Sequence, residues 1–151
     1  IKWVNDLYYR GKKVCGILTE AGADLESGRL EWLVVGIGLN FTTAADEFPE
    51  ELRRVAGSLF PGGPAPVGRV ALAAAIAREL LSFCPAFDCL DEYRTRCFVP
   101  GHWVTVCTGR ETYAALALAI DDTGQLLVRR ENGREEALRH GEVSIRPTKT
   151  E

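Results

Sequence analysis

The segment Ile1–Asn40 ends in Trp32-Leu33-Val34-Val35-Gly36-Ile37-Gly38-Leu39-Asn40, a run of mostly apolar residues. Because apolar residues fall on both faces of the strand that this run predicts, we expect a central strand that is buried above and below. A hairpin precedes the run, since β-rich residues at Leu7–Tyr9 and Val14–Thr19 flank a polar turn that contains Gly11. The rest of the chain is expected to cover this unit or to follow it.

The predicted strands carry glycines at positions where a strand ordinarily carries side chains. Gly36 and Gly38 share a face with Asn40, because side chains alternate along a strand. With Gly16 of the hairpin, they predict a strip that lacks side chains and ends in an amide. Two interpretations fit this strip. Either another element of the chain crosses it closely, or a flat or extended small molecule lies on it with a polar end at Asn40.

Lys13 favours the ligand interpretation. It begins a strand in which we expect Val14, Ile17 and Leu18 to be buried, so its ammonium group is predicted to lie at the rim of a pocket. A lysine brings three donors and a compact positive charge, which suits the oxygens of a carboxylate or a phosphate. The neighbouring Lys12 is predicted to be a solvated turn residue.

Three motifs resemble those of one family in their order and spacing. They are Lys2-Trp3-Val4-Asn5-Asp6, Gly11-Lys12-Lys13-Val14-Cys15-Gly16-Ile17-Leu18-Thr19-Glu20 and Val35-Gly36-Ile37-Gly38-Leu39-Asn40. All are similar to motifs in the second half of the catalytic domain of biotin protein ligases (biotin–acetyl-CoA-carboxylase ligases). Gly141-Glu142-Val143-Ser144-Ile145-Arg146 resembles the closing strand of that family's small C-terminal domain. The family usually has proline where this chain has Val4, which does not fix the backbone angle φ.

The resemblance implies an α+β fold in two parts. Residues 1–98 would form part of a class II synthetase-like sheet, mixed or antiparallel and covered by helices, and residues 99–151 a small SH3-like β-barrel. The dipeptide Pro100-Gly101 marks the expected boundary. Sequence patterns predict an exposed turn at Ala21–Arg29, helices at Glu50–Leu59, Arg69–Phe83 and Leu90–Arg96, and five strands at Trp103–Cys107, Thr112–Ile120, Leu126–Arg130, Glu135–Arg139 and Val143–Arg146. The helix at Arg69–Phe83 is expected to cover one face of the sheet.

The resemblance also implies a reaction with two steps. The biotin carboxylate attacks the α-phosphorus of ATP to give biotinyl-AMP and pyrophosphate, and the mixed anhydride then acylates a lysine of the biotin carboxyl carrier protein of acetyl-CoA carboxylase. Lys13 would be the catalytic residue, in contact with the biotin carboxylate and the α-phosphate. The groove for biotin would be lined by Lys13, Gly16, Leu18, Gly36, Gly38 and Leu39. The nucleotide would be bound by Asn5, Asp6, Asn40 and Arg146, with Asp6 helping to hold Mg²⁺.

The amino-acid composition limits the classes of partner and the cell compartment that we expect for this protein. A net charge of −3 argues against a broad surface for nucleic acid, and no apolar run reaches membrane-spanning length. Five cysteines without a Cys-x-x-Cys pair indicate reduced thiols, as in a cytoplasmic protein. The family's arginine- and glycine-rich loop lies upstream of its Lys-Trp motif and has no counterpart in these residues, so we expect weak or no ligase activity from them alone.

Two alternatives share these features. A lipoate–protein ligase would have the same fold and chemistry but would act on a longer, more flexible acid. A non-catalytic module could instead serve in dimerisation or carrier docking. The resemblance is also compatible with a homodimer, and it leaves open whether an N-terminal DNA-binding domain exists.

Overall fold

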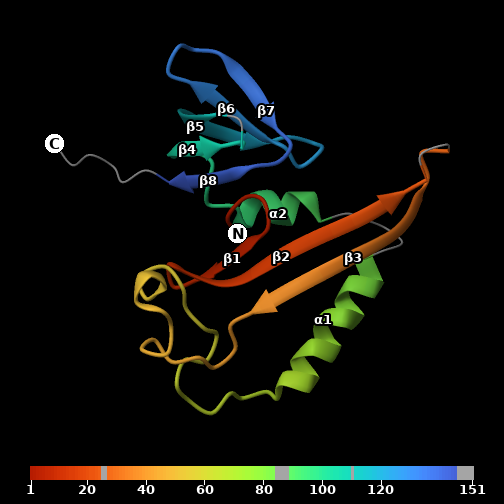
Figure 1. Cartoon of the computed structure of the whole chain (residues 1–151), viewed down its shortest axis with the longest axis vertical. Coiled ribbons are helices and arrows are strands. Elements are labelled where there is room, and N and C mark those ends of the chain that lie inside the picture. Colours follow the sequence, from red (N-terminus) through yellow and green to blue (C-terminus); the bar gives the residue numbers. More distant parts are fainter. Residues whose placement is uncertain (25–26, 84–88, 110, 146–151) are drawn as a thin grey trace. The chain divides into compact units, whose positions relative to one another are not determined.

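The computed structural model describes residues 1–24, 27–83, 89–109 and 111–145. The fold is α+β, as predicted, with two antiparallel sheets and two α-helices among these residues (Figure 1). The chain divides into two compact units, Asn5–Pro85 and the combination of Ile1–Val4 with Ala86–Glu151. The assignment of residues 1–98 and 99–151 to two domains stays a prediction.

The unit Asn5–Pro85 is built on an antiparallel sheet with the strand order β1-β2-β3. The strands are β1 (Asp6–Tyr9), β2 (Lys12–Ala23) and β3 (Leu30–Leu39). The predicted hairpin is confirmed, and Gly11 turns it with a φ of 76°, a left-handed conformation that favours glycine. The predicted turn at Ala21–Arg29 is shorter than expected, because the pairing of β2 with β3 continues to Ala23 and Leu30.

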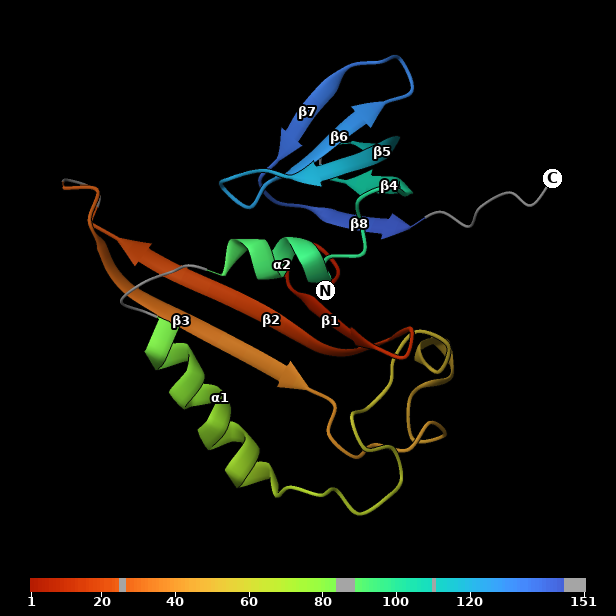
Figure 2. The same ribbon diagram turned by 180° about the vertical axis from the view of Figure 1, so that it is seen from behind.

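The prediction that β3 is buried on both faces is wrong. In the described sheet β3 is an edge strand, and its residues Leu33 and Val34 are each 55% exposed. The helix α1 (Arg69–Phe83) has the predicted bounds and lies alongside β3 in both views (Figures 1 and 2). A cavity nevertheless lies between α1 and β3, and every residue of β3 except Leu39 is exposed, so the helix does not bury the sheet as expected. Apolar strand faces need a covering layer on each side, and this unit supplies neither in full.

The predicted helix at Glu50–Leu59 is also wrong. A single 3₁₀ turn, Glu50–Leu52, is present, and the chain then runs beside the start of β2. There the Lys13 backbone N–H donates to the Val55 carbonyl at 2.8 Å, and the Gly57 N–H donates to the Lys13 carbonyl at 2.9 Å. These bonds use backbone groups that a helix would need for itself, so tertiary pairing has overridden the local preference for helix.

The second unit contains α2 (Leu90–Arg96) and an antiparallel sheet with the strand order β7-β6-β5-β4-β8. Its strands confirm the predictions to within one residue at their ends: β4 (Trp103–Cys107), β5 (Thr112–Ile120), β6 (Leu126–Arg130), β7 (Glu135–Leu138) and β8 (Glu142–Ile145). The pairings of the described residues do not join β7 to β8, so an SH3-like barrel stays a prediction. Neither described α-helix is long and apolar enough to cross a membrane.

Trp3 belongs to the core of this second unit. It is 2% exposed and clusters with buried residues of the sheet such as Val104 and Val128. Its indole Nε1–H donates to the Gly124 carbonyl at 3.0 Å, in the turn between β5 and β6. The burial of an indole whose polar group is satisfied stabilises the fold by a few kcal/mol, about 2–3 for a side chain of this kind.

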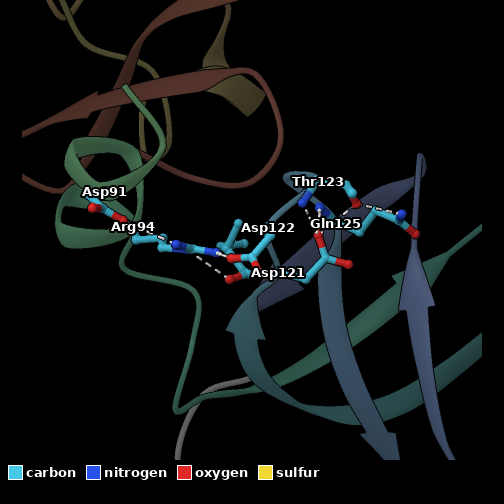
Figure 3. Close-up of polar contacts among 7 residues, drawn as sticks. Asp91, Arg94, Asp121, Asp122, Thr123 and Gln125 are labelled. Atoms are coloured by element: carbon cyan, nitrogen blue, oxygen red, sulfur yellow. Dashed lines mark hydrogen bonds and ion pairs between the residues drawn. The ribbon is translucent and has the colours of Figure 1, made fainter. Parts of the chain in front are cut away.

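Polar contacts hold the turn that receives Trp3. The Asp121 carboxylate accepts hydrogen bonds from the backbone N–H groups of Thr123 and Gln125, at 2.8 and 2.9 Å (Figure 3). Arg94 of α2 forms an ion pair with Asp122 at 2.5 Å, and Figure 3 shows its guanidinium reaching from the helix toward the turn. These contacts tie α2 to the sheet and fix the carbonyl that Trp3 uses.

Arg130 is expected to make the stability of this unit sensitive to acid. Its guanidinium lies 3.6 Å from the Tyr113 ring centroid and pairs with Glu111 and Glu136 at 2.5 and 2.7 Å. Hydrogen bonds from Arg130 hold the pKa of both carboxyls below the ordinary value of 4.5. This stabilisation is complete above the unfolded pKa and is lost as pH falls through the lowered folded values. Arg130→Met should therefore reduce the loss of stability between about pH 5 and pH 3, measured by urea unfolding.

The matched control for this prediction is Arg129→Met. Arg129 pairs with Glu135 at 2.8 Å, but both side chains are about half exposed, so this ion pair contributes little. The control should keep the acid sensitivity of the unmodified protein. An Arg130→Met protein that loses stability in acid as steeply as the unmodified one would contradict the prediction.

Candidate functional site

A β-bulge places Lys13 and Gly16 on the same face of β2. The two residues are three positions apart, so regular alternation would put them on opposite faces. Two successive residues of β1 pair with Cys15 and Lys13 of β2, so Val14 is an extra residue of β2 without a partner residue on β1. This extra residue puts Lys13 and Gly16 on the same face of the strand. A Cβ atom on Gly16 would lie 3.4 Å from Lys13 Nζ. The bulge therefore brings the ammonium group over the glycine.

Lys13 lies in an open groove with a volume of about 520 Å³ on the sheet of this unit. Seven of the ten predicted site residues line it, together with two isoleucines that the motifs contain but the sequence does not distinguish. The lining residues are Asn5, Asp6, Lys13, Gly16, Ile17, Leu18, Gly36, Ile37 and Gly38.

The strip of glycines in the groove is bare within this unit. A Cβ atom on Gly36 would meet the Leu18 carbonyl oxygen at 3.6 Å, and one on Gly38 would meet the Gly16 carbonyl oxygen at 3.7 Å. Both are ordinary contacts with the neighbouring strand, and no helix among the described residues of this unit comes within 4 Å of either Cβ position. Close packing among the described residues of this unit therefore does not account for Gly36 and Gly38.

The ammonium group of Lys13 is paired with a carboxylate. Its Nζ lies 2.6 Å from Asp6 Oδ1, and the side chains are 44% and 17% exposed. An ion pair this open to water contributes on the order of 1 kcal/mol or less, so Lys13 can exchange its partner for another anion at small cost. The sequence did not predict this pair. The neighbouring Lys12 is partly exposed, and its Nζ donates to the Arg53 carbonyl at 2.8 Å.

Two residues that are predicted to bind the nucleotide, Asn5 and Asn40, donate hydrogen bonds from their side-chain amides to backbone carbonyls of the protein. Asn5 Nδ2 donates to the Ile17 carbonyl, which braces the start of β1 against β2. Asn40 Nδ2 donates to the Gly57 carbonyl at 2.9 Å. Asn40 and Leu39 line a different cavity, between β3 and α1, and not the groove. Arg146 lies outside the described residues. The binding roles of all four stay predictions.

The chemistry possible around Lys13 also depends on whether a nucleophilic thiol, or a group of side chains that could hold a metal ion, is present. Burial, and then the negative charge of Asp6, raise the pKa of the Cys15 thiol, which Lys13 lowers by less. Cys15 is thus a neutral thiol at neutral pH and not a nucleophile. Across the described ranges no group of three His, Cys, Asp or Glu side chains gathers that could hold a metal ion. A groove with one carboxylate fits Mg²⁺ that arrives with a nucleotide, since Mg²⁺ is commonly bound by few carboxylates plus phosphate oxygens.

Comparison with known proteins gives consistent matches. Residues 101–146 match the family described as the biotin protein ligase C-terminal domain. The bifunctional ligase/repressor BirA of Bacillus spizizenii is 34% identical over 145 residues, which cover 88% of this chain and 42% of that protein. The biotin–[acetyl-CoA-carboxylase] ligase of Mycobacterium tuberculosis is 33% identical over 132 residues, which cover 83% of this chain and 46% of that protein. The chain thus spans less than half the length of these relatives.

Comparison with solved structures gives the same family as comparison with sequences. The biotin protein ligase of Aquifex aeolicus in complex with biotin and ATP superposes with a TM-score of 0.68 at 26% identity, over 97% of this chain and 61% of that one. Another crystal structure of the Aquifex enzyme gives a TM-score of 0.70. The motifs, the fold and these matches agree that the chain corresponds to the C-terminal region of biotin protein ligases.

Proposed function

We propose that the complete protein is a biotin–protein ligase that forms biotinyl-AMP from biotin and ATP. The observation that carries this proposal is the position of Lys13, whose ammonium group lies over Gly16 at the end of a groove lined by Gly36 and Gly38. A flat ring system fits on a strip that lacks side chains, and a carboxylate at its end would reach the ammonium group. Leu18, 61% exposed at the side of the groove, supplies apolar contact for the ligand.

Lys13 addresses the main obstacle to the first step, the approach of two anions. The biotin carboxylate must meet the α-phosphate of ATP, and both are negatively charged. By leaving Asp6 and donating to oxygens of both reactants, Lys13 would hold them together and neutralise charge as the new bond forms. Loss of one such donor typically costs about two to three orders of magnitude in rate.

Asp6 and its neighbours would serve the nucleotide. With Lys13 turned to the reactants, the Asp6 carboxylate would be free to help hold Mg²⁺, directly or through water, and the ion would supply further positive charge at the phosphates. Asn5, Asn40 and Arg146 would contact the nucleotide. In the second step, a lysine of a biotin carboxyl carrier protein would attack the carbonyl of biotinyl-AMP and release AMP.

The direct test is to incubate the complete protein with ATP and either biotin or lipoate, and to measure adenylate and pyrophosphate. We expect biotinyl-AMP and little lipoyl-AMP. Efficient use of lipoate alone would favour the lipoate ligase, and no adenylate with either acid would favour a non-catalytic module. Residues 1–151 by themselves are expected to show weak or no synthesis, so robust biotinyl-AMP formation by them would contradict that expectation.

A further inference from the structure

We propose that Gly57 is a positioning residue for Lys13, and this inference rests on the ligase function proposed above. The segment Val55–Gly57 forms a parallel bridge with the start of β2, centred on Lys13 and Ala56. Lys13 donates to the Val55 carbonyl and accepts from the Gly57 N–H, so both of its backbone groups are held by this segment. The residue that carries the catalytic ammonium is therefore fixed by a loop that lies outside the groove.

The fit of the loop against β2 requires glycine at position 57. A Cβ atom there would lie 2.9 Å from Lys12 Cβ and 3.3 Å from Lys12 Cδ. The first distance is shorter than real Cβ atoms tolerate, and Lys12 Cβ is fixed by the backbone of the strand. The Lys12 side chain cannot move away freely either, because its Nζ donates to the Arg53 carbonyl at 2.8 Å. Any side chain at 57 would push the loop and the start of β2 apart.

Such a displacement acts directly on the groove. Lys13 lies on the bulge that sets which face its side chain occupies, so a shift of its backbone moves or re-aims the ammonium group over Gly16. A misplacement of about 1 Å at a reacting group can cost about a hundredfold in rate. The loop sets the position of Lys13 without touching substrate, since Gly57 lines a separate cavity with Lys12 and Phe60.

The test compares Gly57→Ala with Gly63→Ala in the complete protein. A Cβ atom on Gly63 would meet nothing closer than 3.9 Å, so this change has the same chemistry in the same region without a clash. We expect Gly57→Ala to lower kcat for biotinyl-AMP formation about tenfold or more at saturating biotin and ATP, and Gly63→Ala to leave it unchanged. The assay temperature is kept well below the unfolding midpoint of each variant.

Introducing Gly57→Ala into the Lys13→Ala protein separates positioning from general damage. If Gly57 acts through Lys13, the second change should cost no further activity, because the group it positions is already gone. Removing the clashing atom with Lys12→Gly should also cancel the effect, so that Gly57→Ala costs nothing further in that background. Should Gly57→Ala fail to fold, Lys12→Met, which removes the bond to the Arg53 carbonyl, replaces it, with the same expected loss in kcat and the same comparison in the Lys13→Ala background.

Two results would overturn the inference while leaving the ligase function intact. One is an unchanged kcat in folded Gly57→Ala protein, and the other is a loss that persists undiminished in the Lys13→Ala background. Absence of biotinyl-AMP synthesis by the unmodified protein would instead overturn the proposed function, and the inference with it.

Discussion

Replacing Lys13 by alanine in the complete protein is expected to slow biotinyl-AMP formation by about two orders of magnitude or more. The ammonium group lies over Gly16 and pairs with Asp6, so its removal takes away positive charge at the place where two anions must meet. Lys13→Gln should have a similar effect, because it keeps most of the length of the side chain but not its charge. Pyrophosphate release under single-turnover conditions measures the step directly.

The matched control for Lys13 is Arg10→Ala. Arg10 is a cation of the same hairpin, but its guanidinium lies 5.1 Å from the Tyr9 ring centroid and outside the groove. The control should keep the rate of adenylate formation. Near-normal turnover by Lys13→Ala, or equal losses in both variants, would remove Lys13 from its catalytic assignment.

Replacing Gly38 by valine is expected to weaken biotin binding about a hundredfold, which is about 2.7 kcal/mol. The nearest atom to a Cβ on Gly38 is the Gly16 carbonyl oxygen at 3.7 Å, so the side chain fits the protein and extends into the groove. Valine is also favoured over glycine in strands, so the fold should not suffer. Titration calorimetry with biotin measures the loss.

Val35→Ile provides the comparison for this variant. It adds a methylene to the same strand, but Val35 lines the cavity beside α1 and not the groove. Biotin affinity should be unchanged in this control. If Gly38→Val binds biotin normally while it remains folded, the strip of glycines is not where the ring system lies.

Local signals in the sequence predicted much of the fold. The hairpin at Gly11 and the bounds of the helix at Arg69–Phe83 both follow from short-range rules, and the structure confirms them. The gathering of Gly16, Gly36 and Gly38 with Lys13 was predicted as well, and it depends on strand alternation plus pairing. The hairpin and the helix are encoded by residues that are close together in the chain, whereas the gathering of the glycines with Lys13 also needs the bulge and the pairing of β2 with β3.

The predictions that were wrong, and the features that were missed, depend on contacts between different segments of the chain. Apolar spacing predicts a helix at Glu50–Leu59, but the pairing of Ala56 with Lys13 takes its backbone groups. The bulge at Val14 arises from the pairing register with β1, which no single run of residues shows. The exposure of β3 depends on which layers cover it, and composition cannot supply that information. The ion pair of Lys13 with Asp6 follows from the same unpredicted register.

The most direct test of the central claim is a crystal structure of the complete protein with a stable analogue of biotinyl-AMP. We predict that Lys13 Nζ has left Asp6 and lies within about 3 Å of an oxygen of the acyl or phosphoryl group, with the bicyclic ring over Gly36 and Gly38. A structure in which Lys13 remains paired with Asp6 while the analogue binds elsewhere would contradict the account.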